Sequence, residues 1–198
     1  MPDYYQAHPK AYHQKTVCID PTSFLEPLQK HLEPGCRILD IGCGSGRDMR
    51  WLKKRGFNAM GFERSAGLAE LARQNTGCEV IEGDFEDFDF TECPSDAVLC
   101  VGSLVHVHHE KLPAILSRVM AGLKQGGKVM ITVKQGHGTH TDEFGRVFHY
   151  WQDNAIRIVF AEQGLAVLDF AEQVSKTTGA DIWLGYVLNK QDCLKQKS

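Results

Sequence analysis

The sequence predicts one doubly wound α/β domain, and two observations support this prediction. Short apolar runs typical of buried strands alternate with amphipathic segments typical of helices, and two further strand-like runs close the chain. The first apolar run leads directly into glycines at alternate positions, Gly42, Gly44 and Gly46. A strand, a glycine turn and a helix in this order form a nucleotide-type site at the carboxyl edge of a parallel sheet.

The composition of the 198 residues restricts the class of protein. A chain of this length can bury a substantial core as a single domain over residues 1–198. Its net charge of −3 provides no overall attraction to nucleic acid or anionic membranes. The seven cysteines are scattered without a C-x-x-C pair, and no apolar stretch reaches membrane-spanning length. We therefore expect a cytoplasmic monomer or homodimer that binds no membrane, with nucleic acid disfavoured as a partner.

The hydrophobic pattern predicts the order of the elements. Residues 96–102 are almost continuously apolar, as expected of a central strand buried on both faces, and residues 111–124 place apolar side chains on one helical face. Pro27 weakens or kinks the helical pattern of residues 21–32. We expect strands at residues 38–41, 58–63, 78–81, 96–102, 129–133, 165–170 and 182–188, and helices at residues 21–32, 49–55, 66–74, 111–124 and 153–163.

The glycine turn does not follow the dinucleotide-binding pattern G-x-G-x-x-G. That pattern requires a third glycine at position 47, where the chain has Arg47. Asp40 precedes the first glycine by two residues and would repel a pyrophosphate, but not a sulfonium ligand with an ammonium group. An acid, any residue and then Gly-x-Gly-x-Gly resembles the first motif of class I S-adenosylmethionine-dependent methyltransferases.

This resemblance covers residues 35–190 and implies a Rossmann-like sheet of seven strands, mostly parallel, with the last strand inserted antiparallel. It also implies S-adenosylmethionine as the cofactor. Three short segments of the chain together resemble small bacterial methyltransferases of the tellurite-resistance type: Gly-Ser-Gly-Arg-Asp after Cys43, Gly-Arg-x-Phe from Gly145, and Trp183-Leu184.

Candidate cofactor contacts follow the first four strands. Glu63 ends the second strand, where a carboxylate can accept hydrogen bonds from both hydroxyls of a ribose; the alternative is an ordinary solvated acid. The resemblance implies that Asp84 binds the adenine amino group and Phe85 covers the ring, although Asp84 also belongs to an acidic loop. It also places the main chain of 101–103 beside the methionine portion. The expected cofactor site comprises Asp40, Gly42, Cys43, Gly44, Gly46, Glu63, Arg64, Asp84, Phe85, Val101 and Ser103.

Three histidines follow the fourth strand. His106 is the candidate general base, because an unperturbed imidazole titrates near pH ~6.5. The competing interpretation is that His106 only holds the loop and packs against the cofactor. His106 and His108 share one side of an extended segment, but no third ligand follows at a suitable spacing, so we expect no metal site.

Two segments are candidates for binding the methyl acceptor. The resemblance implies that residues 1–33 form a helical cap or lid, in which Tyr5 and Tyr12 either line the site or simply pack on the surface. Residues 135–152 lie where acceptor-binding insertions occur, and the alternative is a surface loop. The acceptor-binding candidates are Tyr5, Tyr12, Lys134, Arg146, Tyr150 and Trp151.

The predicted reaction is transfer of the sulfonium methyl group to a small-molecule acceptor by in-line displacement, which depends mainly on alignment. The Pro-Pro-aromatic signature of amino methyltransferases is absent, which disfavours methylation of a base amino group. The alternatives are a tRNA methyltransferase and a non-catalytic S-adenosylmethionine-binding regulator. A dinucleotide oxidoreductase is disfavoured by Arg47 and Asp40.

Overall fold

The computed structural model describes residues 3–176 and 178–191. Its central sheet has seven strands in the order β3-β2-β1-β4-β5-β9-β8. The five strands β3, β2, β1, β4 and β5 are mutually parallel, whereas β9 lies antiparallel between β5 and β8. The doubly wound sheet with an inserted antiparallel last strand is therefore confirmed. The strands are β1 (Arg37–Ile41), β2 (Asn58–Glu63), β3 (Val80–Glu82), β4 (Ser95–Val101), β5 (Leu123–Lys134), β8 (Leu165–Val174) and β9 (Ile182–Lys190).

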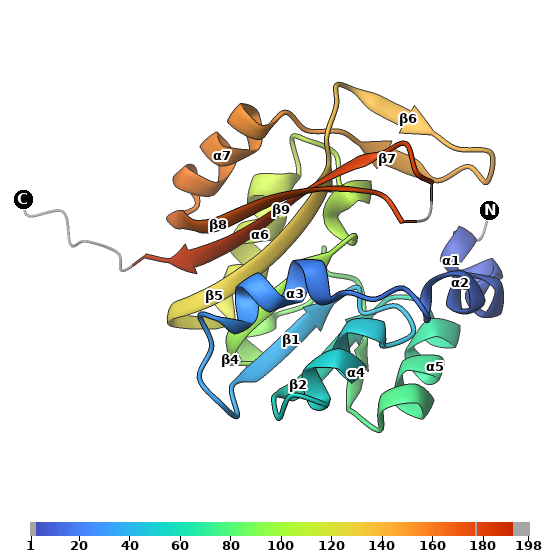
Figure 1. Cartoon of the computed structure of the whole chain (residues 1–198), viewed down its shortest axis with the longest axis horizontal. Helices are drawn as coiled ribbons and strands as arrows, with labels where there is room; N and C mark the ends of the chain where they lie inside the picture. The colour runs from blue at the N-terminus through green and yellow to red at the C-terminus, as the bar shows by residue number, and fades with distance from the viewer. Residues whose placement is uncertain (1–2, 177, 192–198) are drawn as a thin grey trace, which may run out of the picture.

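Helices cover both faces of the sheet. In the described part of the chain they are α1 (Tyr4–Ala7), α2 (Pro9–Thr16), α3 (Thr22–Gln29), α4 (Arg47–Lys53), α5 (Ala66–Thr76), α6 (Leu112–Ala121) and α7 (Asp153–Glu162), with 3-10 turns η1 (Phe90–Glu92) and η2 (Leu104–His106). The cores show that α3, α4 and α5 pack on one face and α6 and α7 on the other. In Figure 1, α1 and α2 lie next to α5, on the same side as the hairpin of β6 (Thr139–Thr141) and β7 (Val147–His149).

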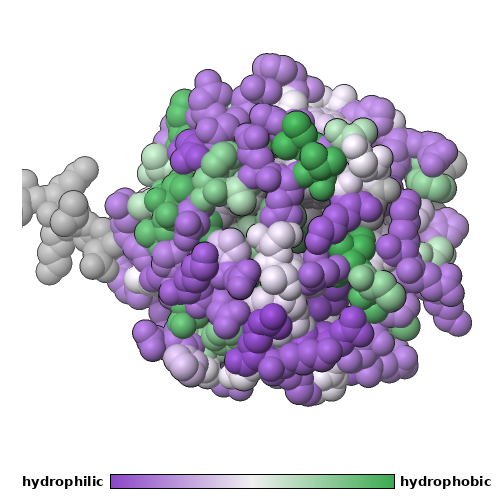
Figure 2. All heavy atoms as spheres, viewed as in Figure 1, coloured by the Kyte–Doolittle hydropathy of each residue, from purple (hydrophilic) through white to green (hydrophobic). Residues whose placement is uncertain are grey.

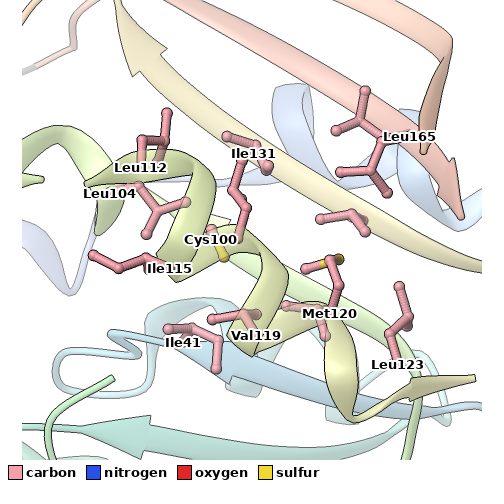
Figure 3. Packing of buried hydrophobic residues seen from close by; sticks show 14 of the residues in the cluster. Ile41, Cys100, Leu104, Leu112, Ile115, Val119, Met120, Leu123, Ile131 and Leu165 are labelled. Atoms are coloured by element: carbon pink, nitrogen blue, oxygen red, sulfur yellow. The ribbon is translucent and has the colours of Figure 1, made fainter. Parts of the chain in front are cut away.

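Strand β4 is apolar at successive positions because both of its faces are buried. Ala97 and Leu99 pack on the face with α3 and α4, and Val98 and Cys100 pack on the face with α6. Each is at most 1% exposed. Burying a large apolar side chain contributes about 1.5–3 kcal/mol, so the strand is stabilised from both faces. Figure 3 shows the α6 side of this core, including Ile115 of α6.

The greatest departure from the predicted elements lies between α6 and β5. The helix expected over residues 111–124 ends at Ala121. Gly122 follows, and a Cβ atom there would lie 2.1 Å from the Phe90 carbonyl oxygen. The chain then enters β5 at Leu123, earlier than expected, because Leu123 pairs with Ser95 before a register shift.

Residues 135–152 contain a small hairpin of β6 (Thr139–Thr141) and β7 (Val147–His149). Strand β7 contacts η2, which follows β4. The segment expected to bind an acceptor is therefore brought to the carboxyl edge of the parallel strands, where α1 and α2 also lie (Figure 1).

The face shown in Figure 2 is mainly hydrophilic, with hydrophobic residues in separate groups. Across residues 3–176 and 178–191, none of the helices combines the length and apolarity that a membrane span requires.

Candidate active site

The glycine turn follows β1 and has a backbone that requires glycine. Gly42, Gly44 and Gly46 have φ values of +70°, +56° and +83°, in the left-handed region that other residues rarely adopt. A Cβ atom on Gly42 would lie 2.5 Å from the Cβ of Ser103. One on Gly46 would lie 2.7 Å from the Thr76 methyl carbon. The turn therefore presents bare main chain at the end of β1.

Glu63 connects the end of β2 to this turn. The Gly44 N–H donates to Oε2 at 2.8 Å, and the Ser65 N–H donates to Oε1 at 2.9 Å. Burial raises the pKa of Glu63, while these backbone donors lower it. The carboxylate is thus fixed at the glycine turn, and each oxygen retains a lone pair for a further donor.

The same part of the molecule contains a cavity of two lobes. One lobe, here the Glu63 lobe, has a volume of about 320 Å³ and is lined by Glu63, Asp84 and Phe85 among others. The other, the Lys134 lobe, has a volume of about 220 Å³ and is lined by Lys134 and residues of several elements. Residues that line both lobes mark their junction: Tyr5, Tyr12, Gly42, Gly44, Val101, Gly102, His106 and Arg146.

The N-terminal helix α1 forms part of both lobes and is fastened to the domain by polar contacts. The Tyr5 hydroxyl lies 2.8 Å from His106 Nε2, and the Ser65 hydroxyl donates to the Tyr5 carbonyl at 2.9 Å. The Gln6 amide donates to the Arg64 carbonyl at 2.8 Å, and the Arg64 guanidinium pairs with Asp3. Segments distant in sequence therefore meet at the junction of the lobes.

His106 has a defined tautomer. Its Nδ1 lies 2.6 Å from the Val147 carbonyl oxygen, which can only accept, so Nδ1 carries the hydrogen. In the neutral ring, Nε2 then accepts from the Tyr5 hydroxyl. Burial lowers the pKa of His106, and the charges of Arg146 and Lys134 lower it further. The imidazole is therefore neutral at neutral pH.

The other two histidines of this segment do not line the cavity. The rings of His108 and His109 pack against His149, with centroids 5.1 and 5.4 Å away. His109 Nε2 lies 2.8 Å from the Tyr150 carbonyl oxygen. Within the described ranges, no group of His, Cys, Asp and Glu side chains is placed to hold a metal ion.

Asp40 is buried behind the glycine turn. It is 2% exposed, and its Oδ2 has no hydrogen-bond partner among the described residues. Burial, together with the negative charge of Asp48, raises the pKa of Asp40 well above its ordinary value. Neither Asp40 nor Gly46 lines the two lobes. Gly46 instead precedes α4 and packs against Thr76.

The remaining cofactor candidates are distributed around the Glu63 lobe. Arg64 Nη1 lies 3.6 Å from Asp84 Oδ2, and Ser103 has a buried hydroxyl without a partner in the described structure. Arg64, Asp84, Phe85, Val101 and Ser103 all line this lobe, whereas Cys43 lines the other.

The acceptor candidates divide into two groups. Tyr5, Tyr12, Lys134 and Arg146 line the Lys134 lobe, but Tyr150 and Trp151 do not. The Tyr150 hydroxyl donates to Asp181 Oδ1 at 3.4 Å. Trp151 is 6% exposed and belongs to the main core.

Comparison with known proteins identifies the domain. Residues 38–127 match a family model described as a methyltransferase domain. The chain is 29% identical over 100 residues to the malonyl-[acyl-carrier protein] O-methyltransferase of Serratia marcescens, covering 50% of this chain and 38% of that one. It is 32% identical over 105 residues to the probable tRNA methyltransferase 9B of Mus musculus, covering 51% and 22%. The chain thus spans less than half the length of these two relatives.

Solved structures with the same fold cover nearly the whole chain. A 1,6-didemethyltoxoflavin-N1-methyltransferase from Burkholderia thailandensis, solved with 1,6-didemethyltoxoflavin and S-adenosylhomocysteine, has a TM-score of 0.77 at 20% identity and covers 95% of this chain and 84% of that one. A TehB-like S-adenosylmethionine-dependent methyltransferase from Corynebacterium glutamicum has a TM-score of 0.71 at 20% identity, covering 93% and 99%. Residues 38–127 therefore carry a methyltransferase domain, and the fold of nearly the whole chain is that of these S-adenosylmethionine-dependent methyltransferases.

Several wall residues of this methyltransferase domain were not identified from the sequence. Arg47 and Asp48 line the Lys134 lobe and form an ion pair at 2.7 Å, and their place directly after Gly46 was an available signal. Asp181 and Trp183 also line this lobe. Their position depends on the pairing of β9 with β5, for which the local sequence contains no signal.

Proposed function

We propose that this protein transfers the methyl group of S-adenosylmethionine to a small-molecule acceptor. The observation that carries the proposal is the Glu63 carboxylate, buried at the end of β2 and bound to the Gly44 N–H at 2.8 Å beside a two-lobed cavity. A donor site next to an acceptor site is what a direct group transfer requires.

The residues of the Glu63 lobe fit S-adenosylmethionine. The Glu63 oxygens can accept from the ribose hydroxyls, and Asp84 and Phe85 can hold adenine. The bare glycine turn admits a ligand next to the main chain, and the unpartnered Oδ2 of Asp40 lies behind it. When bound, the cofactor supplies an activated methyl group on a sulfonium. The chain's own residues bind, orient and enclose the reactants.

The contacts that hold α1 across the cavity favour a small acceptor. Tyr5 bonds to His106 across the junction, and Arg146 of the hairpin segment lines both lobes. We infer that α1 acts as a lid and that the 135–152 segment forms the wall on the acceptor side.

Thermal unfolding with S-adenosylhomocysteine, S-adenosylmethionine or NADH tests the cofactor assignment. A ligand at a hundred times its dissociation constant adds ~2.7 kcal/mol. For a domain of 198 residues this corresponds to a rise of roughly 5–10 °C. We expect the rise with the two adenosyl compounds only. A rise with NADH alone would refute the proposal.

A second candidate acceptor is tRNA, because one relative is named a probable tRNA methyltransferase. Transfer of a radiolabelled methyl group to total tRNA, compared with transfer to small-molecule extracts, distinguishes the two acceptors. Labelled tRNA would overturn the small-molecule assignment. Cofactor binding without label in either fraction would favour a regulator.

A further inference from the structure

Three charged or polar groups from different elements surround one aromatic ring in the Lys134 lobe. The Lys134 ammonium at the end of β5 lies 4.0 Å from the centre of the Phe148 ring. The Arg146 guanidinium carbon lies 5.3 Å from the same centre, and the His106 ring centroid lies 4.7 Å away. His106 and Arg146 also line the junction with the Glu63 lobe. The cationic part of the lobe is therefore next to the place where the lobes meet.

The Lys134 ammonium retains capacity for an anionic ligand. Lys134 is 8% exposed, and Asp181 Oδ2 at 2.9 Å is its one hydrogen-bond partner within the described chain. An ammonium has three N–H donors. The aromatic rings of Phe148, Tyr150 and Trp183 lie around it, with centres 4.0, 5.7 and 5.7 Å away. These rings attract a cation less strongly than an anionic hydrogen-bond acceptor does.

The charges on the lobe wall favour a ligand of low negative charge. Asp142 neutralises Arg146 through a 2.6 Å contact, but Asp142 does not itself line the lobe. Among the charged side chains that do line it, five are cationic and three are acidic: Lys15, Arg47, Lys134, Arg146 and Lys176 against Asp20, Asp48 and Asp181. With Asp142 counted against Arg146, the excess is one positive charge, which suits a monoanion better than a dianion such as a phosphate monoester.

No acidic side chain of the lobe wall is placed to remove a proton from an acceptor. Asp48 is paired with Arg47, and Asp181 with Lys134. Asp20 accepts from both the N–H and the hydroxyl of Thr22. At the junction, the Nε2 lone pair of His106 is directed at the Tyr5 hydroxyl.

We propose that the acceptor is a monocarboxylate with a flat apolar body. Its carboxylate lies beside Lys134 and Arg146, and its body lies against Phe148 and Trp183. This inference rests on the proposed methyltransferase function and specifies the acceptor of the same cavity. His106 then holds the lid through Tyr5, as a positioning residue, because an ionised carboxylate needs no base.

The transfer balances without a proton. A carboxylate oxygen lone pair forms the bond to the methyl carbon, while the carbon–sulfur bond breaks and its electron pair remains on sulfur. The products are a methyl ester and S-adenosylhomocysteine. The ester has lost the negative charge that Lys134 and Arg146 attract, so the wall that binds the acid holds the product less tightly.

The test measures base-labile methyl ester formed from radiolabelled S-adenosylmethionine with benzoate, indole-3-acetate and hexanoate. The amide of each acid and a matched phenol serve as controls. We expect ester with at least one aromatic acid and none with its amide. With the acid, kcat/KM should stay flat between pH 6 and 9, whereas a phenol that must be deprotonated gives a rising profile.

Lys134→Met keeps an unbranched side chain over Phe148 and removes the charge. We expect the KM for the acid to rise at least tenfold, with the dissociation constant of S-adenosylhomocysteine changed less than twofold. Lys124→Met is the matched control, because Lys124 lies at the opposite end of β5 and also pairs with an aspartate, Asp96, at 2.6 Å. Its kinetic constants should not change.

Three results overturn the inference. The first is faster transfer to phenols or amines than to acids, and the second is an unchanged KM in Lys134→Met. The third is that no acid forms ester and none binds the S-adenosylhomocysteine-loaded protein more tightly than its amide. If the protein does not bind S-adenosylhomocysteine at all, the proposed function itself fails, and the thermal unfolding experiment shows this separately.

Discussion

Replacing Glu63 with glutamine tests the geometry of the cofactor site. The amide nitrogen would have to face either the Gly44 N–H or the Ser65 N–H, both of which donate to the carboxylate at 2.8 and 2.9 Å. A buried donor left without an acceptor costs about 1–3 kcal/mol. The variant also loses one charged acceptor for the ribose, and hydrogen bonds to charged groups contribute about 1.5–3 kcal/mol. We therefore expect the dissociation constant to rise about 10- to 140-fold.

Isothermal titration calorimetry with S-adenosylhomocysteine measures this change directly. Glu82→Gln is the matched control, because Glu82 is the register partner of Glu63 on β3, is 44% exposed at its side chain and pairs with Arg73. Its affinity should change less than twofold. If a folded Glu63→Gln variant binds as tightly as the unmodified protein, the carboxylate is not the ribose anchor.

Two further predictions concern the glycine turn and its surroundings. Because the folded state raises the pKa of Asp40, ionised Asp40 destabilises the fold, and Asp40→Asn should raise the midpoint of thermal unfolding at pH 8. The gain should vanish below about pH 4, where both states are protonated, and a loss at pH 8 would contradict the reasoning. In Gly46→Ala, the new Cβ atom would lie 2.7 Å from the Thr76 methyl carbon, and the backbone would keep a φ of +83° that alanine rarely adopts. The substitution should therefore lower the free energy of unfolding, measured by urea titration, by about 2–4 kcal/mol. Gly56→Ala, with φ +85° in open space, should cost about 1–2 kcal/mol, and equal losses would show that the contact is unimportant.

The central sheet was predictable because its signals are local. The apolar run 96–102 indicates a strand buried on both faces, and the structure buries Val98 and Leu99 on opposite faces of β4. The glycine turn was also predictable, since alternate glycines after a strand are typical of a backbone with positive φ angles, which other residues rarely adopt. The boundary between α6 and β5 was not predictable. Position 122 requires glycine because the Phe90 carbonyl, distant in sequence, lies where a Cβ atom would be.

The walls of the cavity depend on contacts that no short segment encodes. Tyr5 and His106 are 101 positions apart in the chain, yet their side chains share a hydrogen bond. Trp183 reaches the Lys134 lobe only because β9 pairs with β5 in the register that places Trp183 opposite Lys134. Trp151 was an acceptor-binding candidate because its segment is rich in polar and aromatic residues, but its side chain is buried in the main core of the domain.

The insertion of β9 between β5 and β8 also imposes an order on folding during synthesis. Strands β1 to β5 can pair as soon as residue 134 is available, but the outer edge of β5 then has no neighbour until residues 182–190 have been made. That edge runs along Val129 to Val133, an apolar segment able to pair with strands of other chains. A nascent or truncated chain that lacks β9 therefore presents an aggregation-prone edge at a position that the complete sheet covers.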